Sequence, residues 1–319
     1  MFAVAEFGST VRRDSDATSD KDLLVVGKGR CAYEAQRRYE SLGYAVSTYS
    51  PAQLVHMRDA GSLFVQHLKA ESRILVDPKN RFSTFLRGCE FQAPTSTEVT
   101  KCVRSLMIAF SSPTTSHVSL WKYDFLYCLA RDYLIKRTAS ANGVFFGLND
   151  LERECFDHWG ISEVEFAPMR ILRRYKSAHR NGVRLLLPDE NAEQGLYNLL
   201  VRTGLFARTQ PKRSNFVEVI RRARNLGASY VKLRVLEGAY KSLWETEYSH
   251  PDHPKLVALL TKPNYSRSTS KFRREVVDNY LRDIQAELTA NKSVERTLDR
   301  SFPSLPLRSV AVKRRSPQR

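Results

Sequence analysis

Two aspartates and a glycine–serine pair near the amino terminus are the residues whose types and spacing point most directly to chemistry. Gly8 and Ser9 end a short apolar run, and Asp20 and Asp22 follow after a polar stretch, just before a second apolar run. On a strand, the side chains of Asp20 and Asp22 would project to one face, where two carboxylates repel each other unless a divalent cation lies between them. A glycine–serine turn offers backbone N–H groups and a hydroxyl to phosphate. Because Mg²⁺ binds through one or two carboxylates together with substrate phosphates, the pattern indicates a site for a metal-bound nucleoside triphosphate.

The elements that would position these residues alternate along the first 100 residues. Apolar runs with β-branched and aromatic residues indicate strands at residues 3–7, 22–26, 44–48 and 74–76. Segments between them indicate helices at residues 31–42, after Ser50 and at residues 62–71. Ser50, Pro51 and Gln53 are typical of a helix start, with Ser50 as N-cap and Gln53 closing a capping box. This order predicts a small mixed β-sheet with helices packed on it.

Beyond residue 100 the sequence predicts helices almost throughout. Apolar residues recur at helical spacing in segments that include residues 121–136, 196–200, 216–226 and 272–288. Asn149, with Glu152 three residues later, predicts another helix that opens with a capping box. We therefore expect an α+β protein with a small mixed-sheet domain at residues 1–100, a mostly α-helical domain at 101–290, and a basic, disordered tail at 291–319.

The strings Phe7–Asp14 and Thr18–Val26, the second with its Asp-Lys-Asp and apolar run, are similar to the signature of the polymerase-β-like nucleotidyltransferase superfamily. They most resemble its small bacterial members, the minimal nucleotidyltransferases, which are kin to the MNT half of HEPN–MNT pairs. Residues 61–71 also resemble a segment found in a subgroup of these proteins. His67, in that segment, is expected to be a packed, hydrogen-bonded core histidine, with a role near the phosphates as the alternative. The resemblance covers residues 1–90, approximately.

The resemblance implies an enzyme that transfers a nucleoside monophosphate from a nucleoside triphosphate to an acceptor hydroxyl and releases pyrophosphate. Carried over to this sequence, Gly8 and Ser9 would hold the triphosphate, and Asp20 and Asp22 would be the catalytic carboxylates that bind Mg²⁺. Kinship with paired proteins also suggests a toxin–antitoxin or phage-defence system, in which a partner protein would take part.

Two departures from the family pattern leave an alternative open. The strand at residues 44–48 carries no third acid, since Ser47 occupies its place, and Lys21 stands between the aspartates where an apolar residue is usual. Either Glu71 or Asp77 helps to hold the second metal, or the site binds nucleotide without efficient turnover. In the latter case the protein would be a non-catalytic nucleotide- or nucleic-acid-binding antitoxin or regulatory subunit.

Basic residues are concentrated in the predicted helical part. The formal net charge is +17; residues 1–100 carry 13 Lys+Arg and 12 Asp+Glu, and the other 219 residues carry 38 bases and 22 acids, a net of +16. Such a surface would repel polycationic substrates, so we expect RNA with a tRNA-like 3′ end as the acceptor. An acidic protein surface is the competing acceptor. The remaining alternative is a solvated basic surface that only aids solubility. The predicted nucleic-acid contacts are Arg170, Arg173, Arg174, Lys212, Arg213, Arg221, Arg222 and Arg224.

The composition excludes several other classes of protein. Hydrophobic residues make up 42% of the chain, yet no apolar run approaches the ~20 residues that span a bilayer, and no charged region precedes an apolar one at the amino terminus. The five cysteines lack CxxC spacing, which predicts reduced thiols rather than a zinc site. We therefore expect a soluble, cytoplasmic protein without membrane contact.

Overall fold

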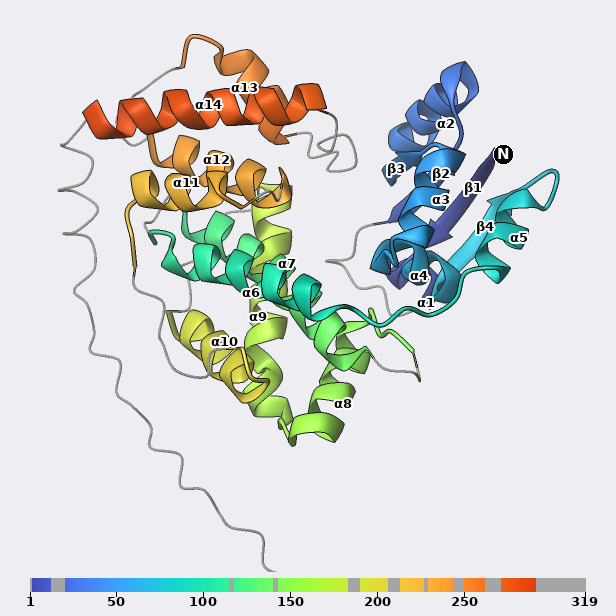
Figure 1. Ribbon diagram of the computed structural model, residues 1–319, viewed down its shortest axis with the longest axis horizontal. Coiled ribbons are helices and arrows are strands. Elements are labelled where there is room, and N and C mark those ends of the chain that lie inside the picture. The colour runs from blue at the N-terminus through green and yellow to red at the C-terminus, as the bar shows by residue number, and fades with distance from the viewer. Residues whose placement is uncertain are drawn as a thin grey trace, which may run out of the picture.

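The computed structural model describes residues 2–12, 21–114, 118–139, 143–182, 190–205, 213–226, 229–243, 250–261 and 271–290. Figure 1 shows a small sheet flanked by short helices, drawn in blue, beside a larger body of helices drawn in green to red. This is the predicted α+β architecture, with a mixed sheet first and helices after it. The predicted tail at 291–319 lies outside the described residues.

The sheet has four strands, and their bounds agree closely with the predicted ones. They are β1 (Ala3–Phe7), β2 (Asp22–Val26), β3 (Ala45–Tyr49) and β4 (Ser72–Val76). Their order is β3-β2-β1-β4, with β2 and β3 parallel and the other neighbours antiparallel. Phe7, the last residue of β1, pairs with both Asp22 and Ser72. The end of β1 therefore lies beside the starts of β2 and β4.

Helices cover both faces of this sheet, because successive side chains of a strand point to opposite faces. The helices of this part are α1 (Ser9–Arg12), α2 (Gly29–Ser41), α3 (Pro51–Asp59), α4 (Leu63–Ala70) and α5 (Arg81–Arg87). Leu24 of β2 belongs to a core with Leu54 and Leu68, which places α3 and α4 on its face. Leu23 belongs to a second core with Ala32 of α2 on the opposite face.

The larger body is built from helices, of which α7 (Ser119–Thr138) contacts four others. They are α6 (Ser96–Ser111), α7 (Ser119–Thr138), α8 (Leu148–Trp159), α9 (Glu163–Asn181), α10 (Glu190–Arg202), α11 (Phe216–Arg224), α12 (Ser229–Leu243), α13 (His253–Thr261) and α14 (Lys271–Ala290). α7 contacts α6, α8, α9 and α12. The indole N–H of Trp121 on α7 donates to the carbonyl of Arg234 on α12 over 2.9 Å. A Cβ at Gly238 would overlap the Trp121 ring, so the close approach of α12 requires glycine there.

Capping boxes begin several helices, although not all where they were predicted. At α3 the Ser50 hydroxyl accepts from the Gln53 N–H (3.2 Å) and the Gln53 side chain accepts from the Ser50 N–H (2.7 Å), as expected. The predicted box at Asn149 and Glu152 is wrong. α8 starts earlier, after Gly147, and both side chains bond Arg170 of α9 instead.

The predicted boundary between the two domains, at residue 100, falls within α6, since that helix begins after its N-cap residue Thr95. All five cysteines are unpaired, as predicted. Within the described part of the chain, no helix combines the length and apolar character that crossing a membrane would require.

Candidate functional site

Gly8 forms a tight turn between β1 and α1. Its φ of +76° lies in the left-handed region that favours glycine. The Gly8 carbonyl accepts from the N–H groups of Val11 (3.0 Å) and Arg12 (3.2 Å), so α1 begins directly after the turn, at Ser9. The Gly8 N–H itself donates to the carbonyl of Glu71 over 3.1 Å. The donors that this turn offers to a phosphate therefore come from Ser9 onward rather than from Gly8.

Asp22 lies against this turn, as the sequence predicts. It opens β2 opposite Phe7, and its Oδ2 lies 3.4 Å from the position that a Cβ on Gly8 would take. A Cβ at position 8 would be in van der Waals contact with the Asp22 carboxylate, so the turn and the carboxylate lie side by side. Asp20, the other predicted carboxylate, lies outside the described residues.

His67 and Glu71 complete the surroundings of the turn. His67 Nε2 lies 3.9 Å from the same Cβ position at Gly8 and 2.8 Å from Glu71 Oε2. Arg12 of α1 forms an ion pair with the same Glu71 oxygen. Sequence reasoning placed His67 and Glu71 on one helix face but missed Arg12. Arg12 lies four residues after Gly8, and this spacing indicates that Arg12 is near the turn only once α1 is known to be helical.

Burial and charge set the protonation of this pair in opposite ways. Burial lowers the pKa of His67, and the hydrogen bond and charge of Glu71 offset it only in part. Burial acts to raise the pKa of Glu71, but the hydrogen bond from His67 and the charge of Arg12 outweigh it and leave that pKa below its ordinary value. Glu71 is therefore held as a carboxylate within the protein, and we expect His67 to be neutral at pH 7.

The ring of His67 is packed between two aromatic side chains, which agrees with the expectation of a packed core histidine. Phe7 meets it edge-on at 5.6 Å between ring centroids, and Phe146 stacks on it at 4.1 Å with 21° between the planes. Phe146 follows α7 in the helical body, so His67 lies where the sheet part meets that body. No local pattern in the sequence predicts the contact between His67 and Phe146.

We expect Phe146→Ala to loosen this contact. Removing the ring leaves a cavity against His67, and the free energy of unfolding should fall by about 2–3 kcal/mol, at or below the lower end of the range for a phenylalanine deep in a core. Chemical unfolding of the variant and the wild type measures the difference. Phe156→Ala is the matched control, because Phe156 is 61% exposed and should change stability by less than about 0.5 kcal/mol. Equal losses of stability in the two variants would contradict a contribution of the contact between Phe146 and His67 to the free energy of unfolding.

The other acids considered as metal ligands do not join Asp22. Glu71 is engaged by Arg12 and His67. Asp77 follows β4 at the far end of the sheet, where Val76 pairs with Val4, and its carboxylate accepts from the N–H of Ser83 (2.8 Å) at the start of α5. Burial acts to raise the pKa of Asp77, but its hydrogen bonds to the α5 turn outweigh this and lower it. Asp77 is therefore a helix cap in this structure.

The neighbouring strand β3 brings no acid to Asp22. Ser47 lies two residues beyond the level of Asp22, paired with Leu24, and Ala45 stands beside Asp22 itself. Across the described ranges, no group of three or more His, Cys, Asp or Glu side chains could hold a metal ion. Asp22, which is half-buried beside the Gly8 turn, has the position predicted for one carboxylate of the Mg²⁺ site, whereas Glu71 and Asp77 do not fit the role of a further ligand.

The predicted nucleic-acid contacts fall into two groups. On α9, Arg170 is taken up by Glu152 and Asn149. On α11, Arg221 and Arg224 line a pocket together with residues that sequence reasoning missed, and Arg222 shares Glu218 with Arg221. The remaining predicted contacts are Arg173 and Arg174 on α9, Arg213 before α11, and Lys212, which lies outside the described residues.

A buried network of charges inside the helical body was not predicted. Asp124 of α7 is 0% exposed, and its carboxylate accepts from Arg234 (3.0 Å) and from His179 Nδ1 (3.0 Å). Glu237 pairs with Arg234 over 3.0 Å and with Lys241 over 3.1 Å. Nothing in the local sequence marks these charges as buried, because the network joins three separate helices.

Comparisons with protein-family models, curated proteins and solved structures found no match to this chain.

Proposed function

We propose that this protein is a Mg²⁺-dependent nucleotidyltransferase that moves a nucleoside monophosphate from a nucleoside triphosphate to an acceptor hydroxyl. The observation that carries the proposal is the Gly8 turn, which starts a helix at Ser9 and has the Asp22 carboxylate beside it, 3.4 Å from the position that a Cβ on Gly8 would take. A carboxylate next to the N–H and hydroxyl groups at Ser9 is the combination that a metal-bound triphosphate requires. The resemblance of residues 7–26 to the superfamily signature agrees with this assignment.

The residues around the Gly8 turn have distinct roles in the proposed reaction. Asp22, with Asp20, holds Mg²⁺, and the bound ion would neutralise the triphosphate and stabilise charge on the reacting phosphate. The Ser9 hydroxyl donates a hydrogen bond to the triphosphate. Arg12, held by Glu71, fixes α1 against α4 and so keeps Ser9 in position. The acceptor oxygen bonds to the α-phosphorus, the bond to the β-phosphate oxygen breaks, pyrophosphate leaves, and the acceptor proton passes to solvent.

The acceptor in this proposal is RNA. The net charge of +16 beyond residue 100 attracts polyanions and repels polycations, and an acidic protein surface is the competing acceptor. Location in the cytoplasm belongs to the same proposal and is supported by the cysteine pattern, which favours reduced thiols. A role in a toxin–antitoxin or phage-defence system rests on the resemblance alone.

A second candidate function is nucleotide binding without catalysis, as in an antitoxin or regulatory subunit. The specific observation in its favour is the position beside Asp22 on β3, where Ala45 stands and no acid is present. Glu71 cannot replace that acid while Arg12 and His67 engage it.

Incubation with each α-labelled nucleoside triphosphate and Mg²⁺, with total cellular RNA and separately with total protein, distinguishes the two functions. The proposed enzyme labels one acceptor fraction with one nucleotide. Nucleotide-dependent thermal stabilisation without label transfer would favour the non-catalytic function. Neither labelling nor stabilisation would contradict both.

Ser9→Ala should reduce label transfer by about 10-fold, because one hydrogen-bond donor to the triphosphate is lost while backbone donors stay. Thr10→Val is the matched control: it removes the next hydroxyl of α1 and should leave the rate within about 2-fold. The initial rate of label transfer at saturating nucleotide checks both. Equal effects of the two variants would argue against a direct contact between Ser9 and the triphosphate.

A further inference from the structure

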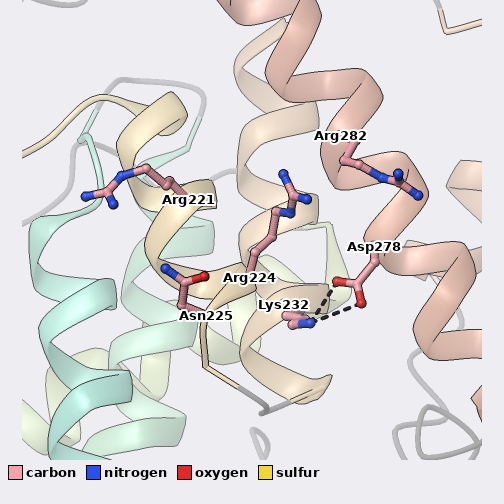
Figure 2. A pocket seen from close by; sticks show the side chains of 6 residues that line it. All are labelled: Arg221, Arg224, Asn225, Lys232, Asp278 and Arg282. Carbon is pink, nitrogen blue, oxygen red and sulfur yellow. Dashed lines mark hydrogen bonds and ion pairs between the residues drawn. The ribbon is translucent and has the colours of Figure 1, made fainter.

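A polar pocket lies in the helical body, away from the Gly8 turn. It has a volume of about 400 Å³ and lies between α11, α12 and α14 (Figure 2). Its lining side chains are Arg221, Arg224, Asn225, Lys232, Asp278 and Arg282. Four of these are cationic and one is anionic, so the lining carries a formal excess of three positive charges.

The cations of this pocket differ in how far they are neutralised. Lys232 Nζ lies 2.8 and 3.1 Å from the two carboxylate oxygens of Asp278. Arg221 is bonded to Glu218, which Arg222 shares. Arg224 and Arg282 hydrogen-bond only neutral amide oxygens within the described part of the chain, those of Gln285 (3.2 Å) and Asn279. Two guanidinium groups that pair with no carboxylate among the described residues therefore lie at one pocket, where an anion would relieve their repulsion.

The arrangement of the arginines favours an extended anion over a compact one. Figure 2 shows Arg224 between Arg221 and Arg282, whose guanidinium groups point away from each other. Arg221 is already bonded to both carboxylate oxygens of Glu218, which leaves Arg224 and Arg282 for an anion. Successive phosphates of a strand could each meet one of these two guanidinium groups, since a guanidinium binds phosphate through two parallel N–H bonds. Phe216 and Ile220 pack one face of α11 into the core. Arg221 and Arg224 are therefore exposed on the other face of this helix.

We propose that this pocket binds the phosphodiester backbone of a single-stranded RNA, with Arg224 and Arg282 each holding a phosphate. The identification of that RNA as the acceptor rests on the proposed function, but the binding does not. Lys232 and Asp278 neutralise each other and link α12 to α14 at the pocket. Asn225 adds an uncharged polar side chain to the lining. Contacts of this kind give affinity without base specificity.

The test is a salt titration of RNA binding by the full chain, without nucleotide. A fluorescein-labelled single-stranded RNA of mixed sequence is titrated with the wild type and with the Arg224→Gln/Arg282→Gln variant. Losing two phosphate contacts should lower the slope of log K against log salt by about 1.4, since each contact contributes about 0.7 for a single strand. The matched control, Arg30→Gln/Arg153→Gln, removes the same charge from exposed positions and should keep the wild-type slope.

Equal slopes for the wild type and the pocket variant, or no RNA binding by the wild type, would overturn the proposal. Tripolyphosphate is the compact competitor: displacement of RNA by micromolar tripolyphosphate in the wild type would mark a compact polyphosphate site and overturn the strand assignment. Melting temperatures of both variants check that each is folded. Because no nucleotide is present, failure of this test leaves the proposed transfer reaction untouched, and absence of transfer leaves the pocket result untouched.

Discussion

Replacing both Asp20 and Asp22 with asparagine should lower the rate of nucleotide transfer by at least about 10³-fold. A metal ion at the reacting phosphate supplies several kcal/mol of transition-state stabilisation, and each 1.36 kcal/mol corresponds to about a factor of ten. Asparagine keeps the shape of the side chain but removes the charge that holds Mg²⁺. The fold should stay largely intact, because the mutual repulsion of the carboxylates disappears together with the metal.

The measurement is the rate of α-label transfer, with the melting temperature as a check of folding. Asp59→Asn is the matched control, because Asp59 is an exposed aspartate of the same part of the chain, at the end of α3. It should transfer label at the wild-type rate. A folded double variant that keeps its activity would remove the proposed mechanism.

Asp124→Asn should lower the free energy of unfolding by about 3–5 kcal/mol. The change leaves Arg234 buried without one of its two carboxylate partners, and breaking a buried ion pair from one side costs this much. Chemical unfolding at pH 7 measures the loss. Asp157→Asn, on an exposed face of α8, is the control and should stay within about 0.5 kcal/mol of the wild type. A variant of Asp124 as stable as this control would contradict the role of the network.

The same network predicts that the wild type loses stability in acid. Burial acts to raise the pKa of Glu237, but the charge of Arg234 and the hydrogen bond from His179 outweigh it and lower the pKa to about 2. The pKa of Asp124 is lowered too, against the effect of burial, chiefly by Arg234 and His179. A carboxyl group whose pKa is lower when folded contributes stability that is complete above its unfolded pKa. That stability is lost as the pH falls from about 4.5 towards 2. Asp124→Asn should have a shallower loss over this interval than the wild type.

Much of the sheet part could be predicted because its signals are local. β1 and β2 have the predicted bounds, and the capping box at Ser50 is present, since alternation and capping depend on residues close in sequence. The short helix α1 was not predicted, because its four residues are too few to show an apolar period. The box expected at Asn149 failed for a different reason. Gly147 starts that helix earlier, which leaves Asn149 free to bond Arg170.

The candidate site was predictable only where its parts are neighbours in sequence or in strand register. Gly8 and Asp22 meet because β1 and β2 pair in a register that places Phe7 opposite Asp22. Glu71 could not be excluded as a metal ligand from the sequence, because its partner Arg12 is 59 residues away. Asp124 lies 110 residues from Arg234, so its buried pairing depends on how α7 and α12 pack. Tertiary packing, rather than any local pattern, decides these roles.

The most direct test of the central claim is which phosphate of the nucleotide reaches the acceptor. Parallel reactions contain the same nucleoside triphosphate labelled on the α- or the γ-phosphate, with Mg²⁺ and RNA. Nucleotidyl transfer at the Gly8 turn predicts that α-label becomes attached to RNA while γ-label leaves as pyrophosphate, in equal amounts. Label on the acceptor from the γ-phosphate, or no labelled acceptor under conditions in which the nucleotide binds, would contradict the account.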